Sequence, residues 1–449
     1  MEVTDIKEKL SDTSEGGEIN VLLIGIYPDT SEEKQCDVSL AELKQLAETS
    51  IGEGSARSKF FSITQCRKAP DSATFIGQGK AEEAAKLCFD NDISLAVMDA
   101  EMSPSQIRNL EDILNKYYDA SSEKHVRVID RTMLILDIFA KHAVTGEGKL
   151  QVEIAQLRYT SPRLTGKGLQ LSRQGGTSGS IGARGPGETK LETDKRHLQR
   201  RIQSLRSELE ELEKERLVKR GKRQKSGIPT AAIAGYTNAG KSTLLNYLTN
   251  AGILAENKLF ATLDPTVRSL TLPSGREILL SDTVGFINKL PHGLIEAFKS
   301  TLDEVRFADI ILVIIDASDP EAERKTAVTE EILNDLSASG KPTVYVFNKS
   351  DMIDVIPPAD VAEAKDAVYI SAKTGEGVEK LLEKLDRILA DSKIKAKFVF
   401  PFDNQSAVSY LYKNTSVESV EYTESGVEVV ALVTAKETGM FSDYLAEDI

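Results

Sequence analysis

The sequence predicts an α/β protein of several domains: two α/β units, a helical hairpin between them and a small α+β domain at the C-terminal end. Two patterns carry this prediction. Short apolar runs alternate with helical stretches in two separate parts of the chain, and leucines between these parts repeat with the 4,3 spacing of a helical seam. The length of 449 residues allows about two to four domains at ~100 to 200 residues each.

The first α/β unit is expected at 19–148, after a polar tail at 1–18. Its apolar runs are typical of buried strands, and they lie at 19–26, 60–66, 93–98 and 126–129. Helical patterns separate and follow these runs, at 40–48, 80–89, 104–117 and 132–142. Strands and helices that alternate in this way predict a parallel sheet covered by helices.

A helical hairpin with a glycine-rich tip is expected at 149–226. Leu150, Ile154 and Leu157 share one face of its first helix. The seam of its second helix consists of Leu191, Leu198, Ile202, Leu205, Leu209 and Leu212. Because this seam is too short to require a partner chain, we expect the second helix to pack on the first, and we expect a monomer.

The tip of the hairpin is cationic, although the net charge of the chain is −14. Between residues 163 and 187 lie eight glycines, no acidic residue and four basic residues, Arg163, Lys167, Arg173 and Arg184. Glycine permits close approach to an RNA backbone, and Arg and Lys pair with its phosphates, so the tip is predicted to contact RNA. A flexible linker is the alternative. The basic run at 219–225 has two possible roles, contact with RNA or a solvated hinge.

The second α/β unit, at 227–392, contains a phosphate-binding motif. Eight consecutive residues match GxxxxGK[ST], namely Gly235, Tyr236, Thr237, Asn238, Ala239, Gly240, Lys241 and Ser242. A strand pattern precedes the motif and a helical pattern from Thr243 follows it, which is the context that the motif requires. Backbone N–H groups are expected to cradle the phosphates, Lys241 to neutralise the terminal phosphates and Ser242 to bind Mg²⁺.

A DxxG motif follows a second apolar run. It consists of Asp282, Thr283, Val284 and Gly285. The Asp282 carboxylate can hold a Mg²⁺-bound water, and the N–H of Gly285 can sense the γ-phosphate. Together with GxxxxGK[ST], this motif predicts a P-loop nucleotide hydrolase.

Two later motifs predict that the base is guanine. The NKxD motif consists of Asn348, Lys349, Ser350 and Asp351. Its Asp351 carboxylate can accept hydrogen bonds from the ring N–H and the exocyclic amine of guanine, groups that adenine does not present there. The loop of Ser371, Ala372 and Lys373 is expected to cap guanine O6 with a backbone N–H. The alternative is that these motifs are only turn residues after buried strands. The order and context of the motifs favour a P-loop GTPase domain.

The hydrolytic machinery differs from that of Ras-like switches. Phe286 follows DxxG where those switches carry a water-orienting Gln, and an aromatic ring cannot position water by hydrogen bonding. We therefore expect slow intrinsic hydrolysis that a partner or a second cation accelerates. Asn238 is a candidate ligand for that cation, K⁺, with a purely structural role in the loop as the alternative. Thr262 and Thr266 compete for the role of switch threonine.

With these motifs, the chain resembles the HflX family of ribosome-associated GTPases. The resemblance covers nearly the whole length, and its most specific mark is the segment 182–192, GARGPGETKLE, just before the second helix of the hairpin. The family's first switch is matched by Phe260, Ala261, Thr262, Leu263 and Asp264. The resemblance implies that Thr262 helps to bind Mg²⁺, with Lys241 and Gly285 as its partners in catalysis, and that an apolar residue at 286 is normal.

The resemblance also implies partners: GTP and GDP, and the large ribosomal subunit with its rRNA. Family members hydrolyse GTP faster on ribosomes, and some split stalled or idle ribosomes. The rivals are a signalling GTPase that acts on a protein or membrane receptor without RNA, and an RNA-remodelling ATPase with the N-terminal domain as its motor. The second rival is weak because that domain has no GxxxxGK[ST].

Composition limits the other classes of function. No window approaches the ~18 consecutive apolar residues of a membrane span, and residues 1–18 do not resemble a signal peptide, so a cytoplasmic protein is expected. The three cysteines, Cys36, Cys66 and Cys88, show no metal-ligand spacing and are expected to be reduced. The remaining 393–449 suggest a small α+β domain.

Overall fold

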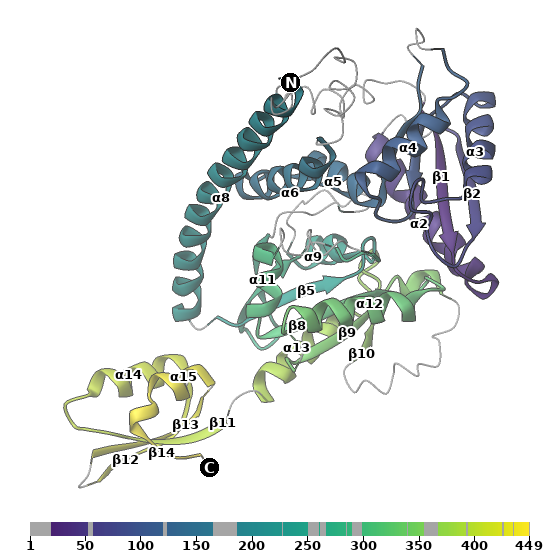
Figure 1. Ribbon diagram of the computed structural model, residues 1–449. Coiled ribbons are helices and arrows are strands. Elements are labelled where there is room, and N and C mark those ends of the chain that lie inside the picture. Colours follow the sequence, from purple (N-terminus) through teal and green to yellow (C-terminus); the bar gives the residue numbers. More distant parts are fainter. Residues whose placement is uncertain are drawn as a thin grey trace. The chain divides into compact units, whose positions relative to one another are not determined.

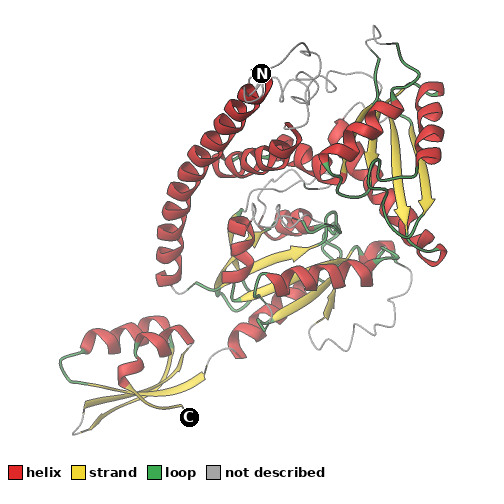
Figure 2. Ribbon diagram, viewed as in Figure 1, coloured by secondary structure: helices red, strands yellow, loops and turns green. Residues whose placement is uncertain are grey.

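The structure is a computed structural model in which the chain forms two compact units (Figure 1). One consists of Met1–Lys214, Leu254–Pro265 and Val284–Leu302, and the other of Glu215–Ile253, Thr266–Thr283 and Asp303–Ile449. The residues that the structure describes are 19–52, 57–119, 124–164, 186–226, 228–249, 260, 266–283, 285–289, 299–338, 340–353, 367–391, 394–423, 426–433 and 435–448. Figure 2 colours the strands of its three sheets yellow.

The first sheet is parallel, with strand order β2-β1-β3-β4. Its strands are β1 (Asn20–Tyr27), β2 (Phe60–Cys66), β3 (Ile93–Met98) and β4 (Arg127–Asp130). The helices around it are α2 (Glu33–Ile51), α3 (Gln78–Asp90), α4 (Pro104–Leu114) and α5 (Arg131–His142). Helices α2 and α5 pack together, as do α3 and α4, so this sheet has the helix-covered form that the alternating pattern predicts.

Two helix starts in this unit follow from their sequences. Ser103 accepts from the N–H of Gln106, whose side chain accepts from the N–H of Ser103, a capping box with Pro104 at the first helical position of α4. Asp130 accepts from the N–H of Met133 (2.9 Å) and so starts α5 directly at the end of β4. This short connection places Arg131 at the carboxyl edge of the sheet.

The hairpin consists of α6 (Gly146–Leu164) and α8 (Pro186–Ser226). Its apolar cluster contains Ile154, Leu157, Leu198 and Leu205, with Leu150, Ile202 and Leu209 packed against it. The predicted packing of the second helix on the first is therefore present. The cluster ends at Leu209 among the described residues, one turn earlier than the expected seam, and Leu191 lies where the structure does not describe side chains.

The second sheet has six strands in the order β10-β9-β8-β5-β7-β6, of which β6 alone is antiparallel to its neighbour. Its strands are β5 (Thr230–Gly235), β6 (Val267–Thr271), β7 (Glu277–Asp282), β8 (Ile310–Asp316), β9 (Thr343–Asn348) and β10 (Ala367–Tyr369). The helices are α9 (Lys241–Thr249), α11 (Lys299–Phe307), α12 (Ala322–Asp335) and α13 (Val378–Asp391).

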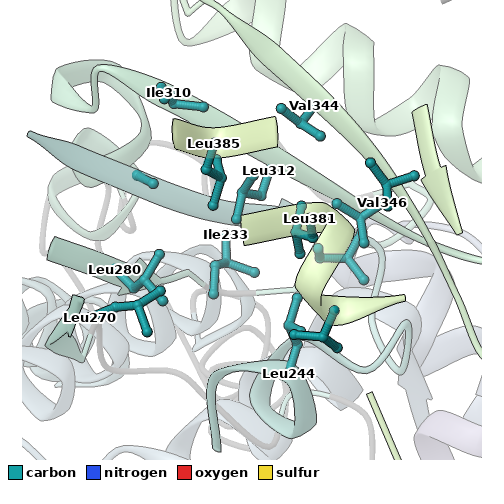
Figure 3. Packing of buried hydrophobic residues seen from close by; sticks show 14 of the residues in the cluster. Ile233, Leu244, Leu270, Leu280, Ile310, Leu312, Val344, Val346, Leu381 and Leu385 are labelled. Carbon is teal, nitrogen blue, oxygen red and sulfur yellow. The ribbon is translucent and has the colours of Figure 1, made fainter. Parts of the chain in front are cut away.

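The core of this sheet joins its strands to two helices (Figure 3). Leu244 of α9 and Leu381 and Leu385 of α13 pack in one cluster with Ile233 of β5 and Leu312 of β8. These side chains are at most 1% exposed, and each contributes about 1.5–3 kcal/mol of burial free energy. The packed core fixes the carboxyl ends of the strands, from which the candidate site is built.

The basic run at 219–225 is helical and belongs to α8. Arg220 is buried: its guanidinium pairs with Glu304 (Nη2–Oε1, 3.0 Å) and lies 4.2 Å from the ring centroid of Phe307, both in α11. The expectation of a solvated hinge or an RNA contact is wrong for this residue, because an ion pair and a ring cover it. Sequence alone gave no sign of a carboxylate more than eighty positions away.

The third sheet is antiparallel, with order β12-β13-β11-β14. Its elements are β11 (Ile394–Phe400), α14 (Gln405–Asn414), β12 (Ser416–Thr423), β13 (Gly426–Val433), α15 (Ala435–Met440) and β14 (Leu445–Asp448). It is the α+β arrangement expected for this part. Among the described residues, no helix is long and apolar enough to cross a membrane.

Candidate nucleotide-binding site

The P-loop begins where β5 ends, and two of its glycines are required by their surroundings. Gly235 has φ +144°, and a Cβ there would overlap the carbonyl oxygen of Ile314 in β8. Gly240 has φ +94°, and a Cβ there would overlap the amide nitrogen of Asn348. Helix α9 follows directly, with the N–H of Leu244 donating to the Gly240 carbonyl (2.9 Å). The loop therefore presents a helix N-terminus beside the end of a buried strand, the arrangement that binds phosphates.

Lys241 is buried, at 7% exposed, and folds back over the loop. Its Nζ donates to the carbonyl oxygens of Gly235 (3.1 Å) and Tyr236 (2.7 Å). Burial lowers the pKa of the Lys241 ammonium to about 8, although the charge of Asp282 acts to raise it. An anionic phosphate at this loop would stabilise the charged form.

The end of β7 brings the DxxG aspartate to the P-loop. Ser242 Oγ donates to Asp282 Oδ2 (3.2 Å), and the other carboxylate oxygen accepts from the N–H of Thr283 (2.9 Å). The Thr283 hydroxyl donates to the carbonyl of Ile233 in β5 (2.7 Å). Asp282 is fully buried, so its side chain is held in one orientation with a hydroxyl oxygen beside it.

Asn348 joins three loops. Its amide nitrogen donates to the carbonyl of Ala239 in the P-loop (2.8 Å), and its amide oxygen accepts from the N–H of Ala372 (2.9 Å). The side chain is 2% exposed, so neither bond competes with water. The NKxD loop, the P-loop and the loop at 371–373 are thereby held at one edge of the sheet.

The rest of the NKxD loop is held by its own contacts. Lys349 has a left-handed φ of 63°, and its Nζ pairs with Asp316 Oδ2 at the end of β8 (2.6 Å). The N–H of Ser350 donates to the carbonyl of Ile370 (3.1 Å). Asp351 follows in a short 3₁₀ turn and is exposed, which leaves its carboxylate accessible to a base.

The loop at 371–373 is closed by local bonds. The N–H of Ser371 donates to the Glu376 carbonyl (2.9 Å), and the Ser371 hydroxyl accepts from the N–H of Thr374 (3.2 Å). Because the N–H of Ala372 donates to Asn348, it is already engaged in this structure. That a backbone N–H of this loop caps guanine O6 stays a prediction.

Several predicted residues lie outside the described part of the chain. These are Thr262 with its neighbours Ala261, Leu263 and Asp264, then Val284, and the side chains of Arg163, Lys167, Arg173 and Arg184. Thr266, the alternative switch threonine, is described: its carbonyl accepts from the N–H of Asp282 (3.0 Å). Its hydroxyl is buried and has no hydrogen-bond partner among the described residues.

The predicted site residues Phe260 and Gly285 are buried and belong to the same compact unit as the first sheet, as does the neighbouring Phe286. The ring of Phe260 lies edge-on to Phe139 of α5, with centroids 4.6 Å apart. Phe286 is 1% exposed, so its ring is a packing group. This burial agrees with the expectation that residue 286 does not orient the attacking water.

Two contributors were not predicted from sequence. Asp316 fixes Lys349, and the ammonium of Lys325 in α12 lies 5.1 Å from the ring centroid of Tyr236 in the P-loop. An acidic residue directly after the buried strand β8 is a usable signal for Asp316, because the ends of neighbouring parallel strands meet. Lys325 has no such signal, since it lies mid-chain in an ordinary helical pattern.

Comparison with known proteins gives matches along almost the entire chain. Family models match residues 37–140 (GTP-binding GTPase N-terminal), 142–223 (GTP-binding GTPase Middle Region), 230–349 (50S ribosome-binding GTPase) and 359–443 (HflX C-terminal domain). The chain is 45% identical over 434 residues to the GTPase HflX of Caldanaerobacter subterraneus subsp. tengcongensis, with 97% of this chain and 94% of the relative covered. The chain belongs to the HflX family.

The chain is also similar to a second curated relative and to a solved structure. The GTPase HflX of Escherichia coli K12 is 42% identical over 367 residues, with 81% of this chain and 83% of the relative covered. A GTP-binding protein from the archaeon Sulfolobus solfataricus, solved in complex with GDP, is 24% identical with a TM-score of 0.41, covering 82% of this chain and 98% of that one. The family models and the HflX relatives show that this HflX-family chain is a GTPase, and the α/β fold class with a P-loop GTPase domain is confirmed.

P-loop GTPases of this kind use Mg²⁺ with GTP, and the oxygen donors of this HflX-family chain fit that ion. A serine hydroxyl and a buried carboxylate lie side by side at Ser242 and Asp282, and hard oxygen ligands are what Mg²⁺ prefers. The Thr237 hydroxyl in the P-loop is buried without a hydrogen-bond partner among the described residues. Bound beside Ser242 and Asp282, Mg²⁺ would neutralise the negative charge that develops on the phosphates during hydrolysis.

The depressed pKa of Lys241 predicts proton uptake on nucleotide binding. At pH 8.5, just above the pKa of about 8, roughly three quarters of Lys241 is neutral in the free chain, and a bound phosphate favours the ammonium. GDP binding should therefore take up a large fraction of a proton at this pH, and it should weaken as the pH rises above about 8. Calorimetry at pH 8.5 in two buffers of different ionisation enthalpy measures this uptake. At pH 7 the uptake should be small, and no uptake at pH 8.5 would contradict the assignment.

Asp351→Asn should weaken guanine recognition. The change removes a charged acceptor worth about 1.5–3 kcal/mol, so the Kd for GDP should rise about ten- to a hundredfold. An asparagine amide can donate to the carbonyl that xanthine carries in place of the guanine amine, so affinity for xanthosine diphosphate should rise. Titration of both nucleotides measures the switch. The exposed Asp335→Asn is the matched control, and equal GDP affinity in the two variants would remove Asp351 from the site.

Proposed function

We propose that this HflX-family GTPase binds the large ribosomal subunit when GTP is bound and splits or remodels stalled or idle ribosomes. The observation that carries the proposal is the family match over almost the whole chain, including a model described as a 50S ribosome-binding GTPase at 230–349. The proposal places the chain in the cytoplasm, where ribosomes are. We also propose that the domains act as units with the limits expected from sequence.

The hairpin tip is the part of the chain best suited to rRNA. Its four cations, at 163, 167, 173 and 184, can pair with phosphates, and its glycines allow close approach. The chain as a whole is nevertheless acidic, with a net charge of −14. Because the acidic surface repels nucleic acid, a local cationic tip favours one orientation of approach over general adhesion to RNA.

Nucleotide state would set the affinity. The γ-phosphate is sensed by the DxxG loop and by the switch threonine, for which we retain Thr262, so the GTP form would hold the ribosome and hydrolysis would release it. Phe286 is buried and orients no water, which supports low activity in isolation. The ribosome would then complete the hydrolytic site.

Co-sedimentation tests the partner. With a non-hydrolysable GTP analogue, the full chain should sediment with the large subunit, and a variant with Arg163, Lys167, Arg173 and Arg184 changed to Ala should bind at least about tenfold more weakly. Binding of the wild-type chain should fall steeply with salt, and each lost phosphate contact should reduce the slope of log K against log salt by about 1.

The control removes the same charge elsewhere. Lys34, Lys86, Lys116 and Lys413 are exposed, and their change to Ala should leave ribosome binding and its salt slope close to wild type. Absence of large-subunit binding by the wild-type chain would end the proposal. Equal loss in both quadruple variants would show that net charge, and not the tip, governs binding.

A monovalent cation is the second part of the proposal. Asn238 has a left-handed φ of 62° in the P-loop, which asparagine tolerates, so its backbone does not require a ligand. If its amide oxygen binds K⁺, hydrolysis should be several-fold faster in K⁺ than in Na⁺ at equal ionic strength. Asn238→Gly keeps the backbone conformation, lacks the oxygen and should abolish this difference. Equal rates in both salts for the wild-type chain would exclude the role.

A further inference from the structure

A half-exposed phenol lies against the loop that is expected to cap guanine O6. The loop at 371–373 continues into Gly375, which has φ +87°. A Cβ on Gly375 would lie 2.0 Å from Tyr247 Oη, 2.5 Å from its Cζ and 2.9 Å from its Cε2. All three distances are far below van der Waals contact, so the edge of the Tyr247 ring occupies the space where a side chain would stand. Glycine permits this close approach.

Tyr247 belongs to α9, the helix that starts at the P-loop. Leu244 and Leu245 of this helix are fully buried in the core of the second sheet, so α9 is fixed against the strands. Thr243, which directly follows the phosphate-binding motif, lies four residues before Tyr247, and residues four apart share one face of a helix. One face of α9 therefore extends from the expected phosphate site to the base loop.

The two ends of the base loop are supported in different ways. At one end, the N–H of Ala372 donates to the buried amide oxygen of Asn348 (2.9 Å). At the other end, the N–H of Gly375 donates to the carbonyl of Ser371 (2.8 Å), a bond that is internal to the loop and moves with it. The Tyr247 ring adds a contact from a separate, rigid element at this second end. The loop therefore lies between a buried amide and a half-exposed ring.

We propose that Tyr247 is a positioning residue for guanine recognition, and that its ring slows nucleotide release by holding the loop at 371–375 against the base. The inference rests on the predicted contact between this loop and guanine O6, and it does not involve the ribosome. Because the Tyr247 side chain is 47% exposed, the ring can leave the loop without opening the core. Its contact with Gly375 therefore controls a local opening of the site.

The direction of the effect follows from preorganisation. A loop that already stands in its binding position loses little freedom when the nucleotide arrives, and this saving appears as affinity. A looser loop lowers the fraction of chains that are competent to bind the base, and the apparent Kd rises by the inverse of that fraction. Changes of this kind within one site act mostly on dissociation. Loss of the Tyr247 ring should therefore speed the release of GDP and GTP.

The first test measures GDP release from the full chain without ribosomes. Tyr247→Ala should raise the dissociation rate of GDP with a fluorescent label on its ribose by about two- to tenfold, the range expected for one ordinary hydrogen bond. Tyr247→Phe keeps the ring and should remain close to wild type. The matched control is Tyr412→Ala, because Tyr412 is an exposed aromatic residue of α14. Equal dissociation rates in Tyr247→Ala and Tyr412→Ala would overturn the proposal.

A change of size at the glycine tests the contact itself. Gly375→Ala places a methyl group against the Tyr247 ring and should speed GDP release. Gly275, between β6 and β7, has a similar φ of +82° with nothing within 4 Å of a Cβ, so Gly275→Ala adds backbone strain without crowding and should leave release unchanged. In the Tyr247→Ala background the space is open, and Gly375→Ala should have a smaller effect than in the wild-type chain. Additive effects would contradict a shared contact and overturn the proposal.

A base analogue separates positioning of the base loop from general loosening of the domain. The diphosphate of 2-aminopurine riboside lacks O6 and cannot accept a hydrogen bond there. The wild-type chain should bind GDP more tightly than this analogue, and Tyr247→Ala should weaken GDP binding more than analogue binding. Equal weakening of both ligands would overturn the proposal. Equal affinity of the wild-type chain for both would remove the loop from guanine recognition, and the proposal with it, while leaving the proposed ribosome partner untouched.

Discussion

The structure of the candidate site depends on one buried amide. Asn348 ends β9, and its two hydrogen bonds fasten the P-loop on one side and the loop at 371–373 on the other. Each bond is ordinary in strength, about 1 kcal/mol net, but an unmatched buried partner would cost more. The close fit of Gly240 against the same side chain shows how little space remains. The loops that are expected to contact the phosphates and the base are therefore joined through one side chain.

Much of the fold could be predicted from sequence because its elements are locally encoded. Strands expected at 60–66 and 93–98 coincide with β2 and β3, since continuous apolar runs between helical patterns have few other interpretations. The last elements, α15 and β14, were not predicted from sequence because they are short and have little apolar pattern. β14 exists through its pairing with β11, which no local signal reveals.

The residues of the site also divide into those that local sequence motifs reveal and those that only tertiary packing brings together. Motif residues such as Lys241, Asp282 and Asn348 could be identified from spacing, and the structure brings them together at the ends of β5, β7 and β9; their roles toward GTP remain predictions. The contact of Tyr247 with Gly375 could not be foreseen, because a helical tyrosine and a distant turn glycine share no motif. Long-range contacts of this kind are set by tertiary packing alone.

Helix α8 is continuous over 41 residues, from the hairpin tip to the buried pair of Arg220 and Glu304. At 1.5 Å per residue such a helix is about 60 Å long, and a rotation of about ten degrees at one end displaces the other by about 10 Å. Its terminal turns are clamped by a guanidinium set against a ring and a carboxylate. Because the helix is long, a small rotation near Arg220 would displace its other end by a much larger distance.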